Sequence, residues 1–563
     1  MNSVSYSKKW SILTFSLCSF IMFFYIKDGL FSINSWLYNL NGDSLKNYYN
    51  VLISAKYSTG LWLNKVNYPF GEQLFYLDSQ PLLAKTLGFL GFENYTIGFV
   101  NALPFISIAI TSIPIFLIQR TLRIPLVINI TTSIIIALLS SQIGRVSVHF
   151  ALAYTIYIPL LLYLITRKEL NGINNYFFLT CTILLFSFLH PYYLLIGIVL
   201  LATLLPYHLF FQFNLKILFC NLLAILIPLI IVKLTLNFTD IVTDRPENPF
   251  GIWKYRSSFE SVFFPKFKPF IEIISGPLGL NPGTFEGNAY VGILGLPIFI
   301  FSIVYFIKKR LQSEKITSYF RTEIFFYLFF SSVIIWLFSL YHPFKFIIDP
   351  TLEIAPVLKQ FRSLGRFGWI FYYTFSIFIS INISNFYAYL KNKTSISIAV
   401  LAISILLSLW FLDANGNMNT IKHYLSKKHY VEVQKSSYLS NIELSEIDNN
   451  SYDAILTLPV FHVGSEIENY EGSSLSIFET FKIASDLGIP FVSTYSSRVS
   501  ASQFQKFQNL KMKGDFSHLF KKGGKILLIA DIRNLNLFES ELLLKNTTIL
   551  FRKGDIVYAE LTP

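Results

Sequence analysis

Residues 192–211 read YYLLIGIVLLATLLPYHLFF, and residues 216–236 read KILFCNLLAILIPLIIVKLTL. The only lysines, arginines or acids in these two runs are Lys216 and Lys233. A helix crosses the hydrocarbon core of a bilayer with about 20 mostly apolar residues. Because lipid cannot hydrogen-bond an exposed backbone, such a run must fold as a helix there. Each run therefore predicts a transmembrane helix.

Apolar runs of similar length recur along the chain, and together they predict about eleven transmembrane helices. The composition agrees, because 53% of the 563 residues are hydrophobic and only 14% are charged, whereas a soluble protein has about 25% charged residues. The runs on either side of His190-Pro191 are also compatible with one broken helix, since proline removes a backbone donor. The predicted spans lie near residues 10–26, 96–118, 126–140, 147–166, 175–190, 192–211, 216–236, 291–307, 322–340, 368–389 and 395–412.

Basic residues predict the orientation of these spans. With the N-terminus in the cytoplasm, lysine and arginine gather in the cytoplasmic turns, as the positive-inside rule requires. An odd number of spans then places the C-terminus outside. This placement also accounts for the formal net charge of +13 without a nucleic acid as partner. The basic turns contain Lys8 and Lys9, Arg120 and Arg123, Arg167, residues 308–310, and Lys391 and Lys393.

Four outer segments are long enough to fold, and the last of them predicts a separate domain. Residues 1–412 form the multi-span region, with outer loops at 27–95, 237–290 and 341–367, and residues 413–563 have the composition of a soluble protein. Within this tail, strands are predicted at 454–458, 491–494, 525–530 and 548–551. A helix is predicted at 477–487, ending at Gly488, and a hairpin turn at Lys553-Gly554. We expect a small α/β domain. It has no glycine-rich phosphate loop, which argues against a nucleotide-driven pump.

Two carboxylates in the first outer loop are candidates for general-base chemistry. Asp43 and Asp78 lie in polar stretches marked by glycine and proline, close to the predicted membrane surface. A carboxylate in such a place can accept a proton from a hydroxyl or hold a divalent cation. The alternative for Asp43 is that it caps a helix over Ser44–Lys56, and the two roles are compatible.

The second and third outer loops end in charged segments just before a span. Glu286 is flanked by Gly283 and Gly287, which would let the backbone approach a ligand closely. On sequence alone, a solvated loop acid is the favoured interpretation. Arg362 and Arg366 are four residues apart and would share one helix face at the height of a phosphate head group. Lipid anchoring is the alternative reading of these two arginines.

Histidines near the outer turns complete the candidates. His190 lies at the outer end of a span, where it could bind a phosphate, although a lone histidine there more often bonds a neighbour. Arg145 and His149 lie near another outer turn and are open to the same two interpretations. No clustered Cys/His motif is present, so any metal would be a hard cation held by carboxylates, magnesium or manganese.

The order of these pieces resembles the GT-C superfamily of membrane glycosyltransferases. The resemblance is carried by Gly42-Asp43-Ser44-Leu45-Lys46-Asn47-Tyr48 after the first span, by residues 286–292, and by Arg362-Ser363-Leu364-Gly365-Arg366-Phe367. YfhO-like proteins, which are linked to glycosylation of surface polymers, share a similar arrangement. The resemblance implies a bacterial inner-membrane protein with an extracytoplasmic C-terminal domain.

The resemblance also implies roles for the candidate residues. Asp43 falls on the catalytic aspartate of the first loop, Asp78 becomes a second acid, and Arg362, Arg366 and His190 become ligands of a carrier-lipid phosphate, with Glu286 nearby. The first loop has no Asp-x-Asp or Glu-x-Asp pair, which some members use with a metal. The implied partners are the bilayer, a polyprenyl-phosphate sugar and a glycan, lipid or protein acceptor, in an inverting transfer.

Two other functions stay open. A transporter or flippase of lipid-linked substrates would have ionisable residues near the middle of its spans and internal repeats; Lys233 lies within a span, but no repeat is evident. A non-enzymatic assembly protein that displays the tail would tolerate replacement of Asp43 and the arginines.

Overall fold

The computed structural model covers the full chain, and the parts it describes are interrupted by short gaps. The described residues are 2–30, 32–38, 40, 42–167, 173–211, 213–246, 251–252, 254–281, 283, 285–312, 316–342, 344–354, 356–425, 431–432, 443–444, 447–464, 469–513, 524–545 and 547–562.

Each of the predicted spans overlaps a helix. Seven of the described helical segments are long and apolar enough to cross a membrane, and two shorter apolar ones lie at Phe150–Thr166 and Glu323–Ser339. The predicted class, a polytopic α-helical membrane protein with a small C-terminal α/β region, is confirmed. The helices are α1 (Asn2–Leu30), α4 (Thr96–Thr121), α5 (Leu126–Leu139), α6 (Tyr157–Thr166), α7 (Ile173–Ser187), α8 (Pro191–Phe210), α9 (Leu215–Thr239), α11 (Gly295–Leu311), α12 (Glu323–Ser339), α14 (Gly368–Lys393) and α15 (Ile396–Leu425).

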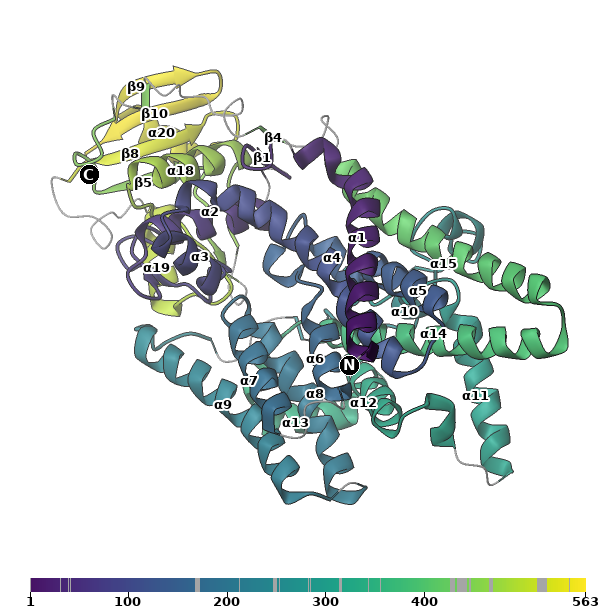
Figure 1. Cartoon of the computed structure of the whole chain (residues 1–563). Helices are drawn as coiled ribbons and strands as arrows, with labels where there is room; N and C mark the ends of the chain where they lie inside the picture. Colours follow the sequence, from purple (N-terminus) through teal and green to yellow (C-terminus); the bar gives the residue numbers. More distant parts are fainter. Residues whose placement is uncertain are drawn as a thin grey trace.

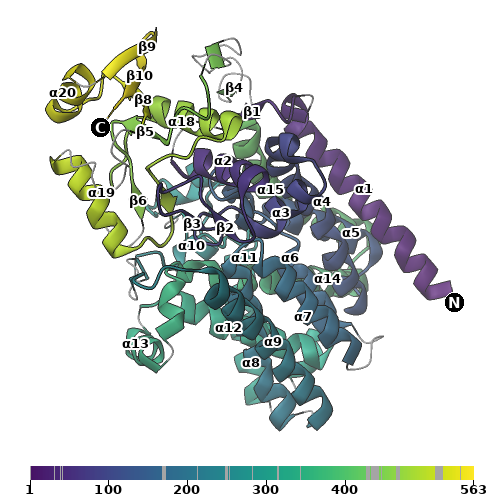
Figure 2. The same cartoon turned by 90° about the vertical axis from the view of Figure 1, so that its left-hand side faces the viewer.

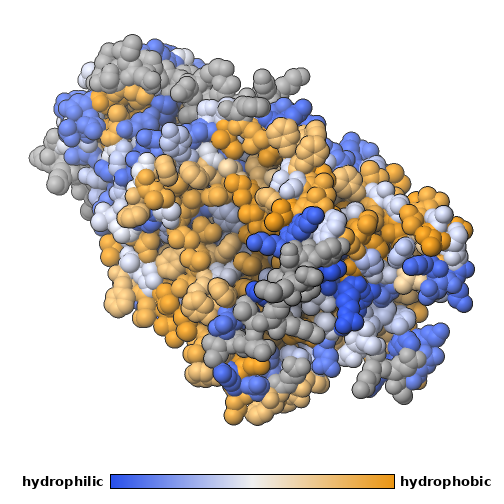
Figure 3. All heavy atoms as spheres, viewed as in Figure 1, coloured by the Kyte–Doolittle hydropathy of each residue, from blue (hydrophilic) through white to orange (hydrophobic). Residues whose placement is uncertain are grey.

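The helices differ in how much of their surface other helices cover. The most apolar part of α14 is 100% buried, so α14 forms the centre of the bundle, whereas the corresponding parts of α9 and α15 are 22% buried. Large apolar side chains such as Phe219, Ile230 and Leu401 are exposed on the outer helices. Figure 3 shows hydrophobic side chains gathered over the helical bundle, while the tail end is more hydrophilic. Exposed apolar surface of this extent is typical of a face that contacts lipid.

The break at His190-Pro191 separates two helices. α7 ends at Ser187 and α8 begins at Pro191. The two helices pack against each other and both pack against α9 (Figure 1). They therefore form a hairpin rather than one broken helix.

The first outer loop folds into a compact unit between the bundle and the tail. α2 (Gly42–Tyr57) packs against α3 (Pro81–Phe89) and α4, and it also contacts α18 (Ser474–Leu487) of the tail. A short antiparallel pair, β2 (Trp62–Leu63) with β3 (Glu72–Gln73), closes the loop. Figure 2 shows α2, α3 and the β2–β3 pair lying between the tail and the membrane helices.

The tail contains a four-stranded mixed sheet. The strand order is β5 (Ala454–Leu458), β8 (Ile526–Asp531), β10 (Ile556–Leu561) and β9 (Thr547–Lys553). β5 and β8 are parallel, and β10 is antiparallel to both of its neighbours. The predicted strands at 454–458, 525–530 and 548–551 and the hairpin turn are therefore confirmed. Residues 491–494 instead make a single bridge from Phe491 to Ile455.

The predicted helix of the tail ends where its sequence indicates. α18 is followed by Gly488, whose φ of +71° is left-handed and favours glycine. α15 continues beyond the predicted boundary at 413 to Leu425. The remaining short elements include β1 (Trp36–Leu37), α10 (Glu260–Phe263), α13 (Lys345–Ile354), β4 (Val431–Glu432), β6 (Val463–Gly464), β7 (Tyr495–Ser496), α19 (Ala501–Lys513) and α20 (Leu537–Lys545).

The outer segments meet at a buried group of ion pairs, here called the Arg245 junction (Arg245, Glu72, Asp240, Tyr76 and Arg498). Arg245 Nη2 lies 2.6 Å from Glu72 Oε1, and Arg245 Nε lies 2.8 Å from Asp240 Oδ2. Arg498 of the tail donates to the backbone oxygen of residue 246 at 2.6 Å. The first loop, the second loop and the tail therefore lie on one side of the bundle, which agrees with the predicted order of spans. Which side is cytoplasmic stays a prediction.

Candidate functional site

Two asparagines in the N-terminal half of α2 bind neighbouring loops. Asn47 Nδ2 donates to the backbone oxygen of Val148 at 3.0 Å, and Asn50 Nδ2 donates to that of Leu77 at 2.8 Å. These amides hold the turn after α5 and the loop before α3 against one face of the helix. The residues that follow each anchored carbonyl, His149 and Asp78, are thereby placed beside Asp43 and Lys46.

Lys46 bridges the two predicted acids. Its Nζ lies 2.9 Å from Asp43 Oδ1 and 2.8 Å from Asp78 Oδ2. The Lys46 side chain is 7% exposed and that of Asp78 13%, whereas that of Asp43 is 40% exposed. Asp43 is therefore the carboxylate of this pair that a ligand can reach.

His190 is fixed by its position as the N-cap of α8. Its Nδ1 accepts a hydrogen bond from the backbone N–H of Tyr192 at 3.2 Å. In the neutral ring the proton must then be on Nε2, because a nitrogen that accepts carries none. Nε2 lies 3.6 Å from Asp78 Oδ1. His190 therefore lies beside one of the two first-loop acids, and its predicted role as a phosphate ligand stays a prediction.

Glu286 holds two arginines. Its Oε1 lies 2.9 Å from Arg145 Nη1, and its Oε2 accepts from Arg366 Nε at 2.8 Å. His149 Nε2 lies 3.8 Å from Glu286 Oε1 and 3.7 Å from Asp43 Oδ2, so His149 links the Glu286 pairs to the Asp43 pair. We call the whole set the Asp43 cluster; it contains Asp43, Lys46, Asp78, Arg145, His149, His190, Glu286 and Arg366.

Two glycines make this arrangement possible. A Cβ on Gly365 would lie 2.5 Å from the Cα of Gly287, and a Cβ on Gly287 would lie 2.2 Å from the backbone oxygen of Arg256. Gly365 N–H also donates to the backbone oxygen of Tyr255 at 2.9 Å. The described contact of Gly287 is therefore with another backbone segment, not with ligand space, and this crossing fixes Glu286 beside Arg366.

Arg362 lies apart from the cluster. Residues 361–363 are not helical, and the following turn, η7 (Leu364–Phe367), is a short 3-10 helix. The prediction that Arg362 and Arg366 share a helix face is therefore wrong. The Arg362 guanidinium instead lies 5.8 Å from the centre of the Tyr255 ring, whereas that of Arg366 lies 4.2 Å from the Tyr192 ring.

Three members of the cluster were not assigned to it from the sequence. Lys46 follows Asp43 by three residues on a predicted helix, and this spacing alone indicates that the two side chains can pair. Arg145 and His149 are four residues apart, but this spacing does not indicate a partner. Only the packing of the turn after α5 against α2 brings them to Asp43. For these two, the sequence offers no signal of their partners.

Burial and neighbouring charges set the protonation states of the cluster. Burial opposes ionisation of Asp43, Asp78 and Glu286, yet adjacent cations hold the pKa of each carboxyl below its usual range. Burial lowers the pKa of His149 to about 4 and also lowers that of His190. At neutral pH the carboxylates are ionised and both histidines are neutral.

The described residues contain no group of three or more His, Cys, Asp or Glu side chains that could hold a metal ion. Within the Asp43 cluster, the space between the two first-loop carboxylates is taken by the Lys46 ammonium. The side chains present there do not fit the predicted magnesium or manganese ion.

Sequence comparison places the multi-span region in a family. A family model described as "Domain of unknown function (DUF6311)" matches residues 15–414. The chain belongs to the DUF6311 family. The match spans every member of the Asp43 cluster and ends before the tail sheet. No curated protein matches the DUF6311 chain in sequence.

Solved structures similar to the DUF6311 chain come from membrane proteins. The Archaeoglobus fulgidus oligosaccharyltransferase in the apo form is 12% identical, with a TM-score of 0.49 over 94% of this chain and 70% of that chain. AglB from Archaeoglobus fulgidus, in complex with an inhibitory peptide and a dolichol-phosphate, is 11% identical, with a TM-score of 0.46 over 98% and 74%. ArnT from Cupriavidus metallidurans, bound to undecaprenyl phosphate, is 10% identical, with a TM-score of 0.44 over 98% of each chain. At these values the similarity assigns no reaction to the DUF6311 chain.

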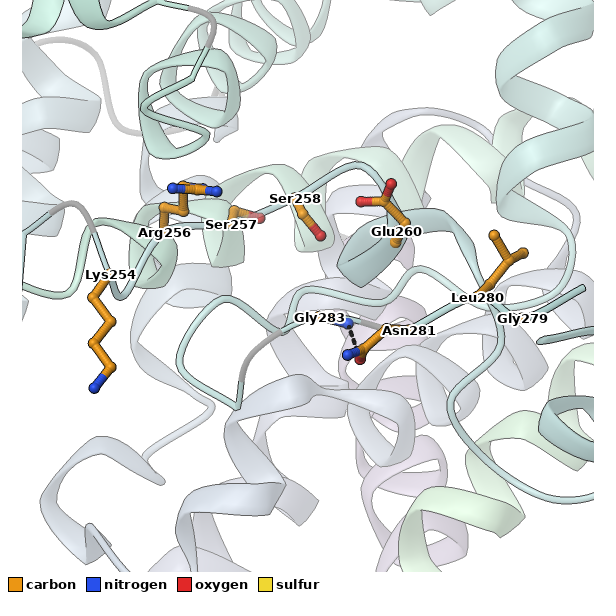
Figure 4. A pocket seen from close by; sticks show the side chains of 9 residues that line it. All are labelled: Lys254, Arg256, Ser257, Ser258, Glu260, Gly279, Leu280, Asn281 and Gly283. Carbon is orange, nitrogen blue, oxygen red and sulfur yellow. Dashed lines mark hydrogen bonds between the residues drawn. The ribbon is translucent and has the colours of Figure 1, made fainter. Parts of the chain in front are cut away.

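A polar cavity of about 600 Å³ lies behind the glycine crossing. Figure 4 shows Arg256, Ser257 and Ser258 following one another along one wall, with Asn281 and Gly283 on the facing loop. Ser257 Oγ donates to the backbone oxygen of Gly287 at 3.2 Å. The same segment therefore lines the cavity and supports the Glu286 turn.

A second cavity, of about 240 Å³, is apolar and lies between the membrane helices beside Arg366. It is lined from α8, α12, α13 and the turn that carries Arg366, by Leu195, Val199, Thr203, Ile334, Ile335, Phe338, Thr351, Leu358, Leu364 and Phe367. Two of these residues, Leu364 and Phe367, belong to the same short 3-10 helix as Arg366. The same short helix therefore carries two lining residues of the apolar cavity and the buried Arg366.

Proposed function

We propose that this chain is a membrane glycosyltransferase that moves a sugar from a polyprenyl-phosphate donor to a hydroxyl of an envelope glycan, lipid or protein acceptor on the outer face. The observation that carries the proposal is the Asp43 cluster itself. An ionised, 40% exposed carboxylate stands in one network with arginines at the ends of the spans. The resemblance of the quoted loop motifs to GT-C enzymes supports the same reaction class.

The donor phosphate would bind at Arg366. The guanidinium has five N–H donors in a planar fork that suits phosphate oxygens. Glu286 engages its Nε, and Tyr192 packs on its face, so the fork is held in one orientation. The adjoining apolar cavity would take the first part of the lipid chain. Arg362 is not given this role because it lies outside the cluster.

Asp43 would act as the general base. It accepts the proton of the acceptor hydroxyl while the hydroxyl oxygen forms a bond to the anomeric carbon. The bond from that carbon to the phosphate oxygen breaks, and polyprenyl phosphate leaves with the electron pair. Attack opposite the leaving group inverts the anomeric centre. General-base catalysis contributes about 10²–10⁴-fold in rate, and Asp78 would position Lys46 rather than touch the acceptor.

Mass spectrometry of cell-surface glycans tests this function. We would compare a wild-type strain, a deletion, and Asp43→Asn at matched membrane abundance. Glu272→Gln is the control, because Glu272 is another outer-loop acid, pairs with exposed Lys268 and is itself 58% exposed. We expect the deletion and Asp43→Asn to lose the same sugar, and Glu272→Gln to retain it.

The same experiment separates the alternative functions. If the deletion changes the glycans while Asp43→Asn behaves as wild type, a flippase or an assembly role replaces the transferase, because neither needs a base at that position. If no strain loses a sugar, surface glycans are not the acceptor. In vitro transfer from a synthetic polyprenyl-phosphate sugar to a hydroxyl acceptor then decides whether any transfer depends on Asp43.

A further inference from the structure

The position of Lys46 suggests how the two first-loop carboxylates are kept together. Asp43 and Asp78 come from different elements, and like charges in a buried site repel each other. The ammonium between them lies within 2.9 Å of both. Burial disfavours a charge on Lys46, yet the two carboxylates raise its pKa, so the ammonium stays protonated. The site therefore contains a permanent cation supplied by the chain.

A divalent ion between the same carboxylates would need a different shell. Magnesium takes six oxygen ligands in a near-octahedral arrangement at about 2.0–2.1 Å, and calcium takes six to eight. Around Lys46, the other neighbours of Asp43 and Asp78 are His149 and His190, at 3.7 Å and 3.6 Å. The third carboxylate of the Asp43 cluster, Glu286, is already held by Arg145 and Arg366. The groups around this position therefore suit an N–H donor better than a divalent ion.

We propose that Lys46 is an internal cation in the place where a divalent metal ion would bridge Asp43 and Asp78, so that this site works without a metal. The proposal rests on the transferase function for its chemical meaning. Lys46 is a positioning residue: it keeps Asp43 ionised and aimed at the acceptor. An ammonium has three N–H donors, and the two carboxylates account for two of them.

Manganese binding tests the proposal without donor or acceptor. Full-length protein in nanodiscs would be stripped with EDTA, and bound Mn²⁺ would be measured by electron paramagnetic resonance during titration. We expect wild type to show no Mn²⁺ binding that depends on Asp78. We expect Lys46→Ser, which removes the ammonium and leaves both carboxylates, to gain one Mn²⁺ site per chain at least tenfold tighter than the background. Lys46→Ser with Asp78→Asn should lose that site again.

The control is Lys56→Ser, which removes a lysine from the same helix but outside the cluster, where Lys56 Nζ donates to the backbone oxygen of Ser485 at 3.0 Å. It should bind Mn²⁺ as wild type does. A folded Lys46→Ser protein that gains no site would overturn the proposal, and so would wild-type binding that Asp78→Asn abolishes. If Lys46→Ser does not fold, the comparison of wild type with Asp78→Asn decides alone.

Activity gives an independent readout. In the transfer assay, wild-type product formation should be unchanged by EDTA, and Mn²⁺ should restore part of the activity that Lys46→Ser loses. Loss of wild-type activity on chelation, reversed by Mn²⁺, would overturn the proposal. Because the titration needs no substrate, a failed transferase assay leaves the metal result standing, and the two failures are distinguishable.

Discussion

The Asp43 cluster and the Arg245 junction are both buried groups of ion pairs between outer segments, yet water reaches them differently. At the junction, the side chains of Arg245, Glu72 and Asp240 are 5%, 0% and 12% exposed. In the Asp43 cluster, one acid, Asp43, is 40% exposed while its partner Lys46 is 7% exposed. The three ion-paired side chains of the junction are therefore almost inaccessible to water, whereas the Asp43 cluster contains one carboxylate that water reaches.

The central arginines of the two networks, Arg245 and Arg366, also differ in their hydrogen-bond partners. Arg245 donates to both oxygens of Asp240, to Glu72 and to the backbone oxygen of Arg498, and its guanidinium lies 4.2 Å from the Tyr76 ring. Each nitrogen of the Arg245 guanidinium therefore donates to a protein acceptor. Arg366 has Glu286 on its Nε and Tyr192 on its face. A guanidinium whose nitrogens all donate to the protein holds loops together. A guanidinium held through its Nε can offer its other N–H groups to a ligand.

The largest effect on stability is expected at the junction. Arg245→Met leaves Glu72 and Asp240 without their cation, and breaking a buried ion pair costs about 3–5 kcal/mol. Thermal unfolding in nanodiscs, followed by tryptophan fluorescence, should show this loss, while transfer activity per folded molecule stays close to wild type. If activity per folded molecule falls as steeply as for Asp43→Asn, the division between the two networks is wrong.

Gly365→Ala should give a smaller loss that affects both stability and activity. The new Cβ would lie 2.5 Å from Gly287 Cα and 3.0 Å from the carbonyl carbon of Arg256. Overpacking of this kind costs about 1–3 kcal/mol, and the displaced crossing would separate Glu286 from Arg366. Gly276→Ala in the second outer loop is the control, since its Cβ would meet nothing closer than 3.4 Å. Unchanged activity in Gly365→Ala would remove Arg366 from the proposed donor site.

The two networks also differ in how far the sequence predicts them. Apolar runs indicate the helices, because length and composition decide whether a segment can cross a bilayer. Asp43, Asp78, His190, Glu286 and Arg366 stand out because they are ionisable residues in short polar stretches close to the ends of such runs. The Arg245 junction has no such signal, because its members, at positions 72, 76, 240, 245 and 498, meet only in the folded chain.

Within the Asp43 cluster, the prediction failed where it assumed regular local structure. The shared face of Arg362 and Arg366 requires a helix, but residues 361–363 are not helical, and Ser363 N–H donates to the Tyr192 hydroxyl at 2.7 Å. Arg145 and His149 were left undecided because their partners lie more than a hundred residues away. Spacing along one helix can be read from sequence, and contacts between distant turns cannot.

The pH dependence of stability gives a finer comparison. The ordinary pKa of histidine is 6.5, whereas that of buried His149 is about 4. Between these values the unfolded chain binds a proton that the folded chain does not, so stability decreases as the pH falls from about 6.5 to about 4. One such proton changes the free energy of unfolding by about 1.4 kcal/mol per pH unit at most.

Replacement of His149 should reduce the dependence of the free energy of unfolding on pH below about 6.5. Unfolding of His149→Gln would be measured at several pH values from 7.5 to 4.5 and compared with wild type and with His342→Gln, which changes an exposed histidine. We expect only His149→Gln to reduce the slope. An unchanged slope would mean that His149 takes up its proton in the folded state, and the cluster would then carry an additional positive charge in acid.

The smallest effect is expected where the tail meets the Asp43 cluster. Tyr495 is 8% exposed, and burial, followed by the charge of Asp43, raises the pKa of its hydroxyl to about 12. The hydroxyl is therefore protonated and electrostatically coupled to the proposed base. Tyr495→Phe keeps the ring, whose centre lies 5.5 Å from that of Phe461, and removes only the hydroxyl. We expect transfer to slow by a few-fold, with no change in the unfolding temperature.

If the rate is unchanged, the tail only docks through the Arg245 junction. If the rate falls as far as in Asp43→Asn, the tail supplies a group to the reaction, and the two networks are parts of one site.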